Sequence, residues 1–589
     1  MKSSAELRTL LHSIDHKSYP AYKSLAGEWN YGSFLLSIDH VQGDPFASPS
    51  SLHIELSHSY TKLPSTYFSK DCMRIALQDF LTRQLAKQFE QYNFKAKGSG
   101  KSGLLSISRC GQKVLERTAC QLTETTLIVR FQVEFPAFGR TINAGELEKI
   151  LFDFLPRCIE NSLLYKNLNH AALETAVFLA EDQEEIRHYL RQEGLIAFVA
   201  NGSILPRKSG ISELPLKDSI PFLSPASMER SIHLPHHGDI TGMAIPQGVT
   251  LIVGGGYHGK STLLGAIQDG VYNHISGDGR EFVITEHTAV KLRAEDGRSI
   301  RNVDISLFIN DLPNKKDTTS FSTEDASGST SQAAGVIESM EAGSRLFLMD
   351  EDTSATNFMV RDAFMQQVIS RDKEPITPFI ERVRDLYKTA GISTIMVAGS
   401  SGAFFYIADH VLLMDCYHTV DITEQVKTLC DQRPVTPTEV PDFSIPNFHR
   451  VLPDHVREQA KYASSENDRK NHRGNNRANS HGNHSNPRHE HMKIKASGVE
   501  SFSLDKETVN VRYLEQLADN EQTMALAYLM RFCLEQVMDG TKTVRETVQT
   551  AMDTLEKKGW DAFCGSYVPC GLAKPRVQEL YACLNRWRG

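Results

Sequence analysis

The chain has 589 residues, of which 40% are hydrophobic and 23% charged, and its formal net charge is −8. This composition is that of an ordinary globular protein long enough for several domains. The acidic balance excludes a protein that is basic throughout, so any surface for nucleic acid must be local. No stretch approaches the roughly 20 apolar residues of a membrane helix. The N-terminus lacks the apolar core of a signal peptide, and the ten cysteines form no C-x-x-C pair, so we expect a cytoplasmic protein with reduced thiols and no membrane span.

The first 200 residues mix helical and strand-like patterns. Apolar residues recur at helical spacing over 5–14, 72–89, 147–155 and 182–193, and strand-like runs cover 34–46, 104–107 and 126–133. Between two of these runs lies a basic loop, FKAKGSGKSG, at 94–103. It imitates a phosphate-binding loop, but Lys95 stands where the first glycine is required, so we exclude a second nucleotide site there.

The strongest motif is LIVGGGYHGKSTLL at 251–264. It places G-x-x-x-x-G-K-[ST] between an apolar strand and a helical run, the context in which the pattern binds phosphate. Glycines let backbone N–H groups face phosphate oxygens, and the helix N-terminus adds partial positive charge. The predicted nucleotide contacts are Gly254, Gly255, Gly256, Tyr257, His258, Gly259, Lys260, Ser261 and Thr262. Lys260 would reach the β- and γ-phosphates and assist catalysis, and Ser261 would hold Mg²⁺. A glycine-rich turn without a ligand is the alternative.

Two carboxylates, Asp350 and Glu351, follow the apolar run 346–349, which predicts a buried strand. Ligands bind at the carboxyl ends of the strands in open α/β sheets. We therefore expect Asp350 to contact Mg²⁺ through water and Glu351 to act as the general base on the attacking water. An acidic turn that merely ends a strand is the alternative.

A Ser-Gly turn opens a predicted helix upstream of these carboxylates, in DASGSTSQAAGVIESM at 325–340. The N–H groups at such a helix start can bind an anion, and Ser327, Gly328 and Ser329 are the candidate contacts. A helix that is simply capped by Ser327 is the alternative.

Taken together, these motifs resemble the ABC-class ATPases, because ASGST at 326–330 is similar to a degenerate LSGGQ signature. The resemblance implies ATP and Mg²⁺ as cofactors and a homodimer, since in that class the signature of one copy meets the γ-phosphate held by the other. GVYNHISGDGRE, MDEDTSATNFM and EPITPF narrow it to a poorly characterised branch without a transport role. One relative is similar to a mitochondrial RNA-editing-associated protein, which implies RNA as a partner.

Several features usual in that class are missing from the sequence. Asn357 replaces the aspartate of the D-loop, and Ser400 lies in the segment where a switch histidine is expected. Gln268 is the only glutamine between Ser261 and the signature, and it falls on the P-loop helix, so the Q-loop is absent. We find no aromatic residue for stacking adenine just before Val249. Slow hydrolysis is expected because Ser400 stands where the histidine would assist.

Two further segments lie close to the predicted nucleotide site in the chain. GDGRE at 277–281 and RAEDGR at 293–298 flank short strand-like runs. They could replace the missing Q-loop in coupling the nucleotide to other domains, or they could be hairpin turns with surface ion pairs.

The predicted fold class is α/β, with an ABC-type P-loop ATPase core that has a mostly parallel sheet, an α+β N-terminal domain and a helical C-terminal domain. The predicted parts are an N-terminal domain at 1–200, a connection at 201–240, the ATPase domain at 241–445, a linker at 446–500 and the C-terminal domain at 501–589. Within the linker, 466–491 has almost no apolar residue, and we expect it to be disordered. Its histidines leave a metal-binding tract as the alternative: His472, His481, His484, His489 and His491.

Three functions remain open. The first is an ATPase in which two copies enclose two ATP molecules and hydrolysis drives a conformational change; the retained Glu351 favours it. The second is a nucleotide-gated clamp on nucleic acid with little turnover, favoured by the missing histidine. The third is an ATPase subunit for a protein partner, which the long flanking domains disfavour.

Local basic segments are the candidates for contact with RNA or another nucleic acid. They comprise Lys95, Lys97, Lys101, Arg207, Lys208, Lys574, Arg576, Arg586 and Arg588. Glycine and serine around the first three let the backbone approach phosphates closely, which suits backbone contact rather than base reading. Solvated surface loops are the alternative.

Overall fold

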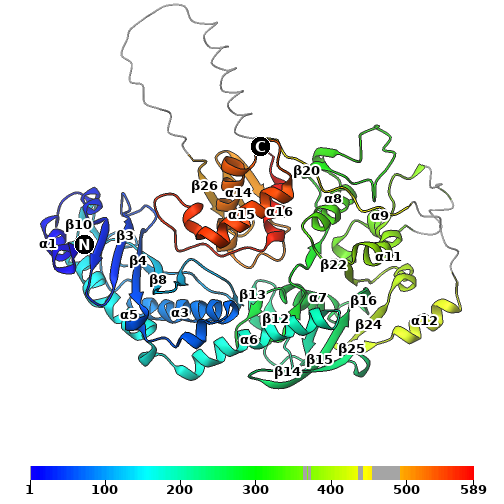
Figure 1. The fold of residues 1–589 in the computed structure, drawn as a ribbon, viewed down its shortest axis with the longest axis horizontal. Helices are drawn as coiled ribbons and strands as arrows, with labels where there is room; N and C mark the ends of the chain where they lie inside the picture. The colour runs from blue at the N-terminus through cyan, green and yellow to red at the C-terminus, as the bar shows by residue number, and fades with distance from the viewer. Residues whose placement is uncertain (1, 362–367, 369–372, 435–441, 454–490, 589) are drawn as a thin grey trace, which may run out of the picture.

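The computed structural model describes residues 2–361, 368, 373–434, 442–453 and 491–588 (Figure 1). Four of the histidines of the predicted low-complexity insert, His472, His481, His484 and His489, lie outside these residues. His491 is described, and its Nδ1 lies 2.7 Å from the Glu535 carboxylate. No helix in the described ranges is long and apolar enough to cross a membrane.

The N-terminal part is built on a seven-stranded sheet that is antiparallel except at one edge. Its strands follow the order β1 (Lys2–Ser3), β2 (Gly27–Asn30), β3 (Leu35–His40), β4 (Ser50–Ser57), β8 (Thr126–Val133) and β5 (Leu105–Ser106), with β7 (Cys120–Leu122) also on β8. Alternate residues of β8 are buried, as the period of a strand with one covered face requires. The α-helices of this part are α1 (Ser4–Ser13), α2 (His58–Thr61), α3 (Asp71–Tyr92), α4 (Ala144–Lys149) and α5 (Leu155–Leu163). The predicted α+β arrangement is therefore confirmed.

One long helix, α6 (His170–Gln192), joins this part to the rest of the molecule. Leu173 and Val177 lie in the N-terminal core, whereas Ile186 and Leu190 pack in a second core. That second core covers an antiparallel sheet with the order β14 (Glu229–Leu234), β15 (Gly238–Pro246), β11 (Leu195–Ala200) and β18 (Val283–Thr285). The predicted connection at 201–240 thus contains β14 as well as the hairpin of β12 (Arg207–Ser209) and β13 (Ser212–Pro215). The domain boundaries themselves stay predictions.

The central sheet has six strands, five of them parallel. Their order is β19 (Val290–Leu292), β22 (Leu346–Asp350), β23 (Ser393–Val397), β16 (Val249–Val253), β24 (His410–Asp415) and the antiparallel β25 (His418–Asp421). Both faces are covered: Leu251 packs in one core and Ile252 in the other. This burial explains why the strands are continuous apolar runs. The predicted mostly parallel core is confirmed.

Helices cover the two faces of this sheet (Figure 1). They include α7 (Lys260–Asp269), α8 (Gly328–Glu341), α9 (Thr356–Met359), α11 (Phe379–Ala390) and α12 (Thr423–Asp431). A hairpin of β20 (Arg298–Val303) and β21 (Phe321–Ala326) leads into α8.

The C-terminal part is mainly helical, as predicted, with one small meander. Its elements are β26 (Ile494–Ser497), β27 (Ser501–Leu504), β28 (Glu507–Asn510), α14 (Asn520–Phe532), α15 (Val544–Lys558) and α16 (Val577–Arg586). Asp519 caps α14, and a Thr543–Glu546 capping box starts α15. Buried ion pairs attach this part to both others: Arg117 contacts Asp519 and Glu521, and Arg586 contacts Glu295.

Candidate functional site

The register of the central sheet brings three strand ends to one level. Val397 of β23 is paired with Asp350 of β22 on one side and with Ile252 of β16 on the other. The segments that follow these strands therefore emerge together at the carboxyl edge of the sheet. They are the glycine-rich loop after Val253, the acidic turn at Glu351 and the Gly399-Ser400 segment.

The glycine-rich loop between β16 and α7 has a backbone that few residues other than glycine can adopt. Gly254 has φ +139°, and a Cβ there would lie 2.3 Å from the Met414 carbonyl oxygen. Gly259, directly before α7, has φ +103°. The loop thus returns tightly into the first turn of α7, whose leading N–H groups have no carbonyl partner within the helix.

Lys260 curls back over this loop. Its Nζ donates to the carbonyl oxygens of Gly254 and Gly255, at 2.7 and 2.8 Å. The ammonium group is therefore held inside the concave side of the loop, where it can exchange these carbonyls for oxygens of an anion.

A hydroxyl and a carboxylate meet beside the loop. The Ser261 Oγ donates to Asp350 Oδ2 at 3.3 Å, and Asp350 is 5% exposed at the end of β22. The other carboxylate oxygen accepts the Asp352 N–H at 3.2 Å, which fixes its orientation. Oxygen donors of this kind are the ligands that Mg²⁺ prefers, so the pair fits that ion.

Glu351 is held by Gly399 and Ser400, which lie in the segment where a switch histidine was expected and is missing. Its Oε2 accepts the N–H groups of Gly399 and Ser400, at 2.6 and 3.0 Å, and the Ser400 hydroxyl donates to Oε1. Burial raises the pKa of Glu351, but these hydrogen bonds and nearby Lys260 outweigh it, so the pKa lies below its ordinary value. Ser400 is thus the group that orients Glu351, a role the sequence did not indicate.

Ser327, Gly328 and Ser329 lie at the start of α8, where the Ser327 side chain accepts the Thr330 N–H. The Ser-capped helix that the sequence left as an alternative is therefore present. In the described part of the chain, no hydrogen bond or ion pair joins these three residues to the glycine-rich loop.

Gln332, buried on α8, connects this helix to the acidic turn and was missed by sequence reasoning. Its Oε1 accepts the Ala355 N–H at 2.8 Å, and its Nε2 donates to Ser354 Oγ at 3.0 Å. Ser354 Oγ in turn donates to the Asp350 carbonyl at 2.9 Å. The only sequence signal was a glutamine two positions beyond the degenerate signature.

An aromatic side chain borders the loop from a part of the chain that sequence reasoning did not consider. Tyr417, in the β24–β25 turn, donates its N–H to the His258 carbonyl at 3.2 Å. Its ring would lie 3.1 Å from a Cβ at Gly259, and it is 53% exposed. The turn is 158 residues away from His258 in the chain, so local spacing gave no hint of it.

The segment 293–298 reaches both the site and the C-terminal part. The Ala294 N–H donates to the Thr353 carbonyl, and the Glu295 N–H to Ser331 Oγ. Arg293 and Glu295 form ion pairs with Glu515 and Arg586.

The ion pairs of the other segment, 277–281, are buried rather than on the surface: Asp278 pairs with Arg207, and Arg280 with Asp269. For 277–281, the alternative of hairpin turns with surface ion pairs is therefore contradicted.

Several predicted contacts to nucleic acid are occupied within the protein. Arg207 pairs with fully buried Asp278 at 2.7 Å, Arg576 with Glu579, and Arg586 with Glu295. Burial of these arginines contradicts their assignment to a nucleic-acid surface. Lys208 is exposed, and the exposed Lys95, Lys97 and Lys101 stay candidates.

Three family models match consecutive parts of the chain. The model for the N-terminal part of ATPases of the ABC class matches 4–166, the ABC ATPase P-loop domain matches 169–449, and the MRB1590 C-terminal domain matches 493–589. Only 1–3, 167–168 and 450–492 lie outside these matches.

Similar individual proteins cover less of the chain. The uncharacterized protein MJ1628 of Methanocaldococcus jannaschii is 31% identical over 231 residues, which are 37% of this chain and 50% of that protein. The chain thus spans about half the length of this curated relative.

Two solved structures resemble the chain, but their TM-scores are low. An ATP-binding cassette of an ABC transporter, MJ1267 in its ADP conformation, is 13% identical over 41% of this chain and 96% of that one. The cbiO1 protein of Clostridium perfringens is 12% identical over the same shares, and both have a TM-score of 0.25. TM-scores this low support no conclusion about the chain. The family models do: the chain belongs to the ABC class of P-loop ATPases.

Proposed function

We propose that the chain binds ATP with Mg²⁺ at the loop between β16 and α7, hydrolyses it with Glu351 as general base, and works as a homodimer in the cytoplasm. The observation that carries this proposal is the convergence of Lys260, Ser261, Asp350 and Glu351 at one edge of the parallel sheet. Cytoplasmic location is inferred from the ten cysteines, all of which are free.

The loop residues fit the phosphates of a nucleotide. Glycine at 254 lets the loop pass close to the Met414 carbonyl of β24, where a Cβ would clash, and the start of α7 offers N–H groups and partial positive charge. Lys260 would neutralise the β- and γ-phosphates, and Ser261 and Asp350 would hold Mg²⁺. When bound, the ion supplies charge that stabilises the phosphoryl group in transfer.

Glu351 would accept a proton from the attacking water. The oxygen of that water bonds to the γ-phosphorus while the bond to the β–γ bridging oxygen breaks, which leaves ADP and phosphate. The three hydrogen bonds from Gly399 and Ser400 keep the carboxylate ionised and oriented. They also make it a weaker base, which supports the expectation of slow turnover.

The proposed dimer follows from the position of the signature. Ser327, Gly328 and Ser329 open α8 with free N–H groups, and a second copy would bring these to the γ-phosphate. The chain Gln332–Ser354–Asp350 would then couple closure of the dimer to the acidic turn.

A nucleotide-gated grip on single-stranded RNA is the second candidate, and one observation favours it. Exposed phenylalanines lie in and beside the lysine loop at 94–103: Phe94, in the loop, is 50% exposed, and Phe46 and Phe138, beside it, are 69% and 78% exposed. Backbone contacts hold the loop against its neighbours, since the Ser99 N–H donates to the Ala137 carbonyl at 2.7 Å. Aromatic rings beside lysines suit unpaired bases as well as their phosphates, whereas the sequence alone had indicated contact with the nucleic-acid backbone only.

Replacing Lys260 by alanine should weaken ATP binding without unfolding the chain. A charge-assisted hydrogen bond contributes about 1.5–3 kcal/mol, so the dissociation constant should rise roughly ten- to a hundredfold. Calorimetric titration with Mg²⁺–ATP measures this. Lys388→Ala, a change on the exposed side of α11, is the matched control and should bind like the wild type. Equal affinity of both variants would contradict the site.

Replacing Ser400 by alanine should move the acid limb of the pH–rate profile to higher pH. The Ser400 hydroxyl helps to lower the pKa of Glu351, and the base is ionised only above that pKa. Losing the hydrogen bond raises the pKa, so activity disappears at a higher pH as the solution is acidified. The profile of kcat against pH for Ser400→Ala and Ser401→Ala tests this. An unmoved limb in Ser400→Ala would show that Glu351 is not the base.

Reversing the charge of the lysine loop should abolish RNA binding. The triple variant Lys95→Glu, Lys97→Glu, Lys101→Glu should fail to bind single-stranded RNA in a filter assay at low salt, and wild-type affinity should fall steeply with salt. The double variant Phe46→Ala, Phe138→Ala should lose more affinity for single-stranded RNA than for double-stranded RNA. Lys493→Glu, Lys495→Glu, Lys506→Glu is the matched control. Binding that survives in the lysine-loop variant would exclude this surface.

A further inference from the structure

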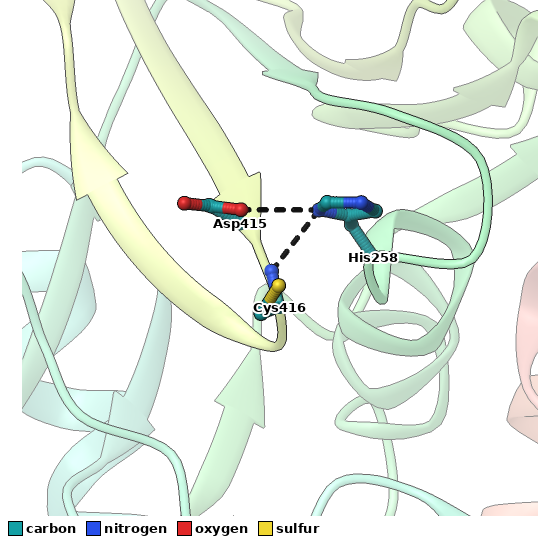
Figure 2. A group of neighbouring side chains, drawn as sticks. All are labelled: His258, Asp415 and Cys416. Carbon is teal, nitrogen blue, oxygen red and sulfur yellow. Dashed lines mark hydrogen bonds and ion pairs between the residues drawn. The ribbon is translucent and has the colours of Figure 1, made fainter.

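The β24–β25 turn lies beside the P-loop and meets it at His258 (Figure 2). The Cys416 N–H donates to the His258 Nδ1 at 3.0 Å, and the Tyr417 N–H donates to the His258 carbonyl. The Asp415 carboxylate lies 3.3 Å from the same Nδ1. The imidazole is therefore directed at the turn, while the backbone of His258 belongs to the loop.

Three different ligand types converge at this contact. One ring nitrogen of His258, one carboxylate oxygen of Asp415 and the Cys416 Sγ all lie within 4.8 Å of one another. Among the described residues this is the one group of three or more histidine, cysteine, aspartate or glutamate side chains with such spacing. We call it the turn–loop cluster.

We propose that the turn–loop cluster is a binding site for one thiophilic divalent cation of the Zn²⁺ type. Zn²⁺ accepts imidazole nitrogen, thiolate sulfur and carboxylate oxygen, and three protein ligands leave its fourth position to water. Mg²⁺ and Ca²⁺ are poor candidates because they prefer oxygen ligands alone. The cluster thus differs in chemistry from the oxygen pair Ser261–Asp350.

The three ligand atoms need to move only a short distance toward one another to bind one ion. Bond lengths of about 2.0–2.3 Å to a tetrahedral ion place its ligands roughly 3.3–3.8 Å apart. The three ligand atoms lie within 4.8 Å of one another, so each pair needs to approach by about 1.5 Å at most. Rotation of side chains can supply this, because the Asp415 side chain is 65% exposed and Cys416 is exposed as well. The Cys416 thiol releases its proton to solvent when the sulfur binds the ion.

Binding would join the hairpin to the P-loop through side chains as well as through backbone. His258 is the only loop residue in the cluster, and Asp415 and Cys416 are adjacent on the turn. A cation here would hold the loop in the position shown in Figure 2. The site stands on its own geometry, without the proposed hydrolysis.

Cobalt titration of the full chain, without nucleotide, tests the proposal. Co²⁺ occupies Zn²⁺ sites, and a Co²⁺–thiolate bond gives a charge-transfer absorption in the near ultraviolet that imidazole or carboxylate ligands alone do not give. We expect this band to saturate at one Co²⁺ per chain and to disappear when one equivalent of Zn²⁺ displaces the cobalt.

Three variants locate the ligands. Cys416→Ser should abolish the band, and His258→Ala and Asp415→Asn should each raise the cobalt concentration for half-saturation at least tenfold. Cys430→Ser, which changes another partly exposed cysteine on α12, is the matched control and should keep the band. Circular dichroism checks that each variant is folded. A missing band in the wild type, or a band that persists in Cys416→Ser, would overturn the site.

Discussion

The hydrogen bond between Ser261 and Asp350 is the contact on which the rest of the site depends, because it joins the glycine-rich loop to the acidic turn. It exists only because β23 holds β16 and β22 at one level, with Val397 paired to both Ile252 and Asp350. The same register delivers Gly399 and Ser400 to Glu351. A slip of one residue in any of these strands would turn its side chains to the opposite face and separate the groups.

The C-terminal part is connected to this edge of the sheet through α7, α8 and the segment 293–298. Gln268 on the P-loop helix donates to the Glu515 carbonyl, and Gln516 donates back to the Gln268 carbonyl. Ion pairs of Arg586 with Glu295 and of Arg293 with Glu515 add a second link. These pairs are mostly buried, and removing one partner of a buried ion pair strongly destabilises the folded protein. If the proposed nucleotide site is correct, these contacts are the ones we propose to couple it to the C-terminal part, in place of the Q-loop that the sequence lacks.

The parts of the site that lie in short local motifs could be predicted from the sequence. The parts that depend on contacts between distant segments could not. The glycine-rich loop and the Asp350-Glu351 pair are each continuous with a buried strand, so spacing alone predicted them. Ser400 and Tyr417 reach the site only through the order of strands, which no local pattern contains. Arg207 and Arg586 looked like surface cations because Asp278 and Glu295, their buried partners, lie far away in the chain. The fold class was predictable because apolar runs alternate with helices, whereas the hairpins within 201–240 have too little periodicity to read.

The most direct test of the proposed ATP-dependent dimer is the molar mass of the Glu351→Gln variant by light scattering in saturating Mg²⁺–ATP. Glutamine keeps the shape of the side chain but cannot take the proton from water, so ATP should persist and hold two copies together. We predict a dimer in ATP and a monomer without nucleotide, with the dimer lost when Ser327→Arg is added. A monomer in saturating ATP, for a variant that calorimetry shows to bind the nucleotide, would contradict the account.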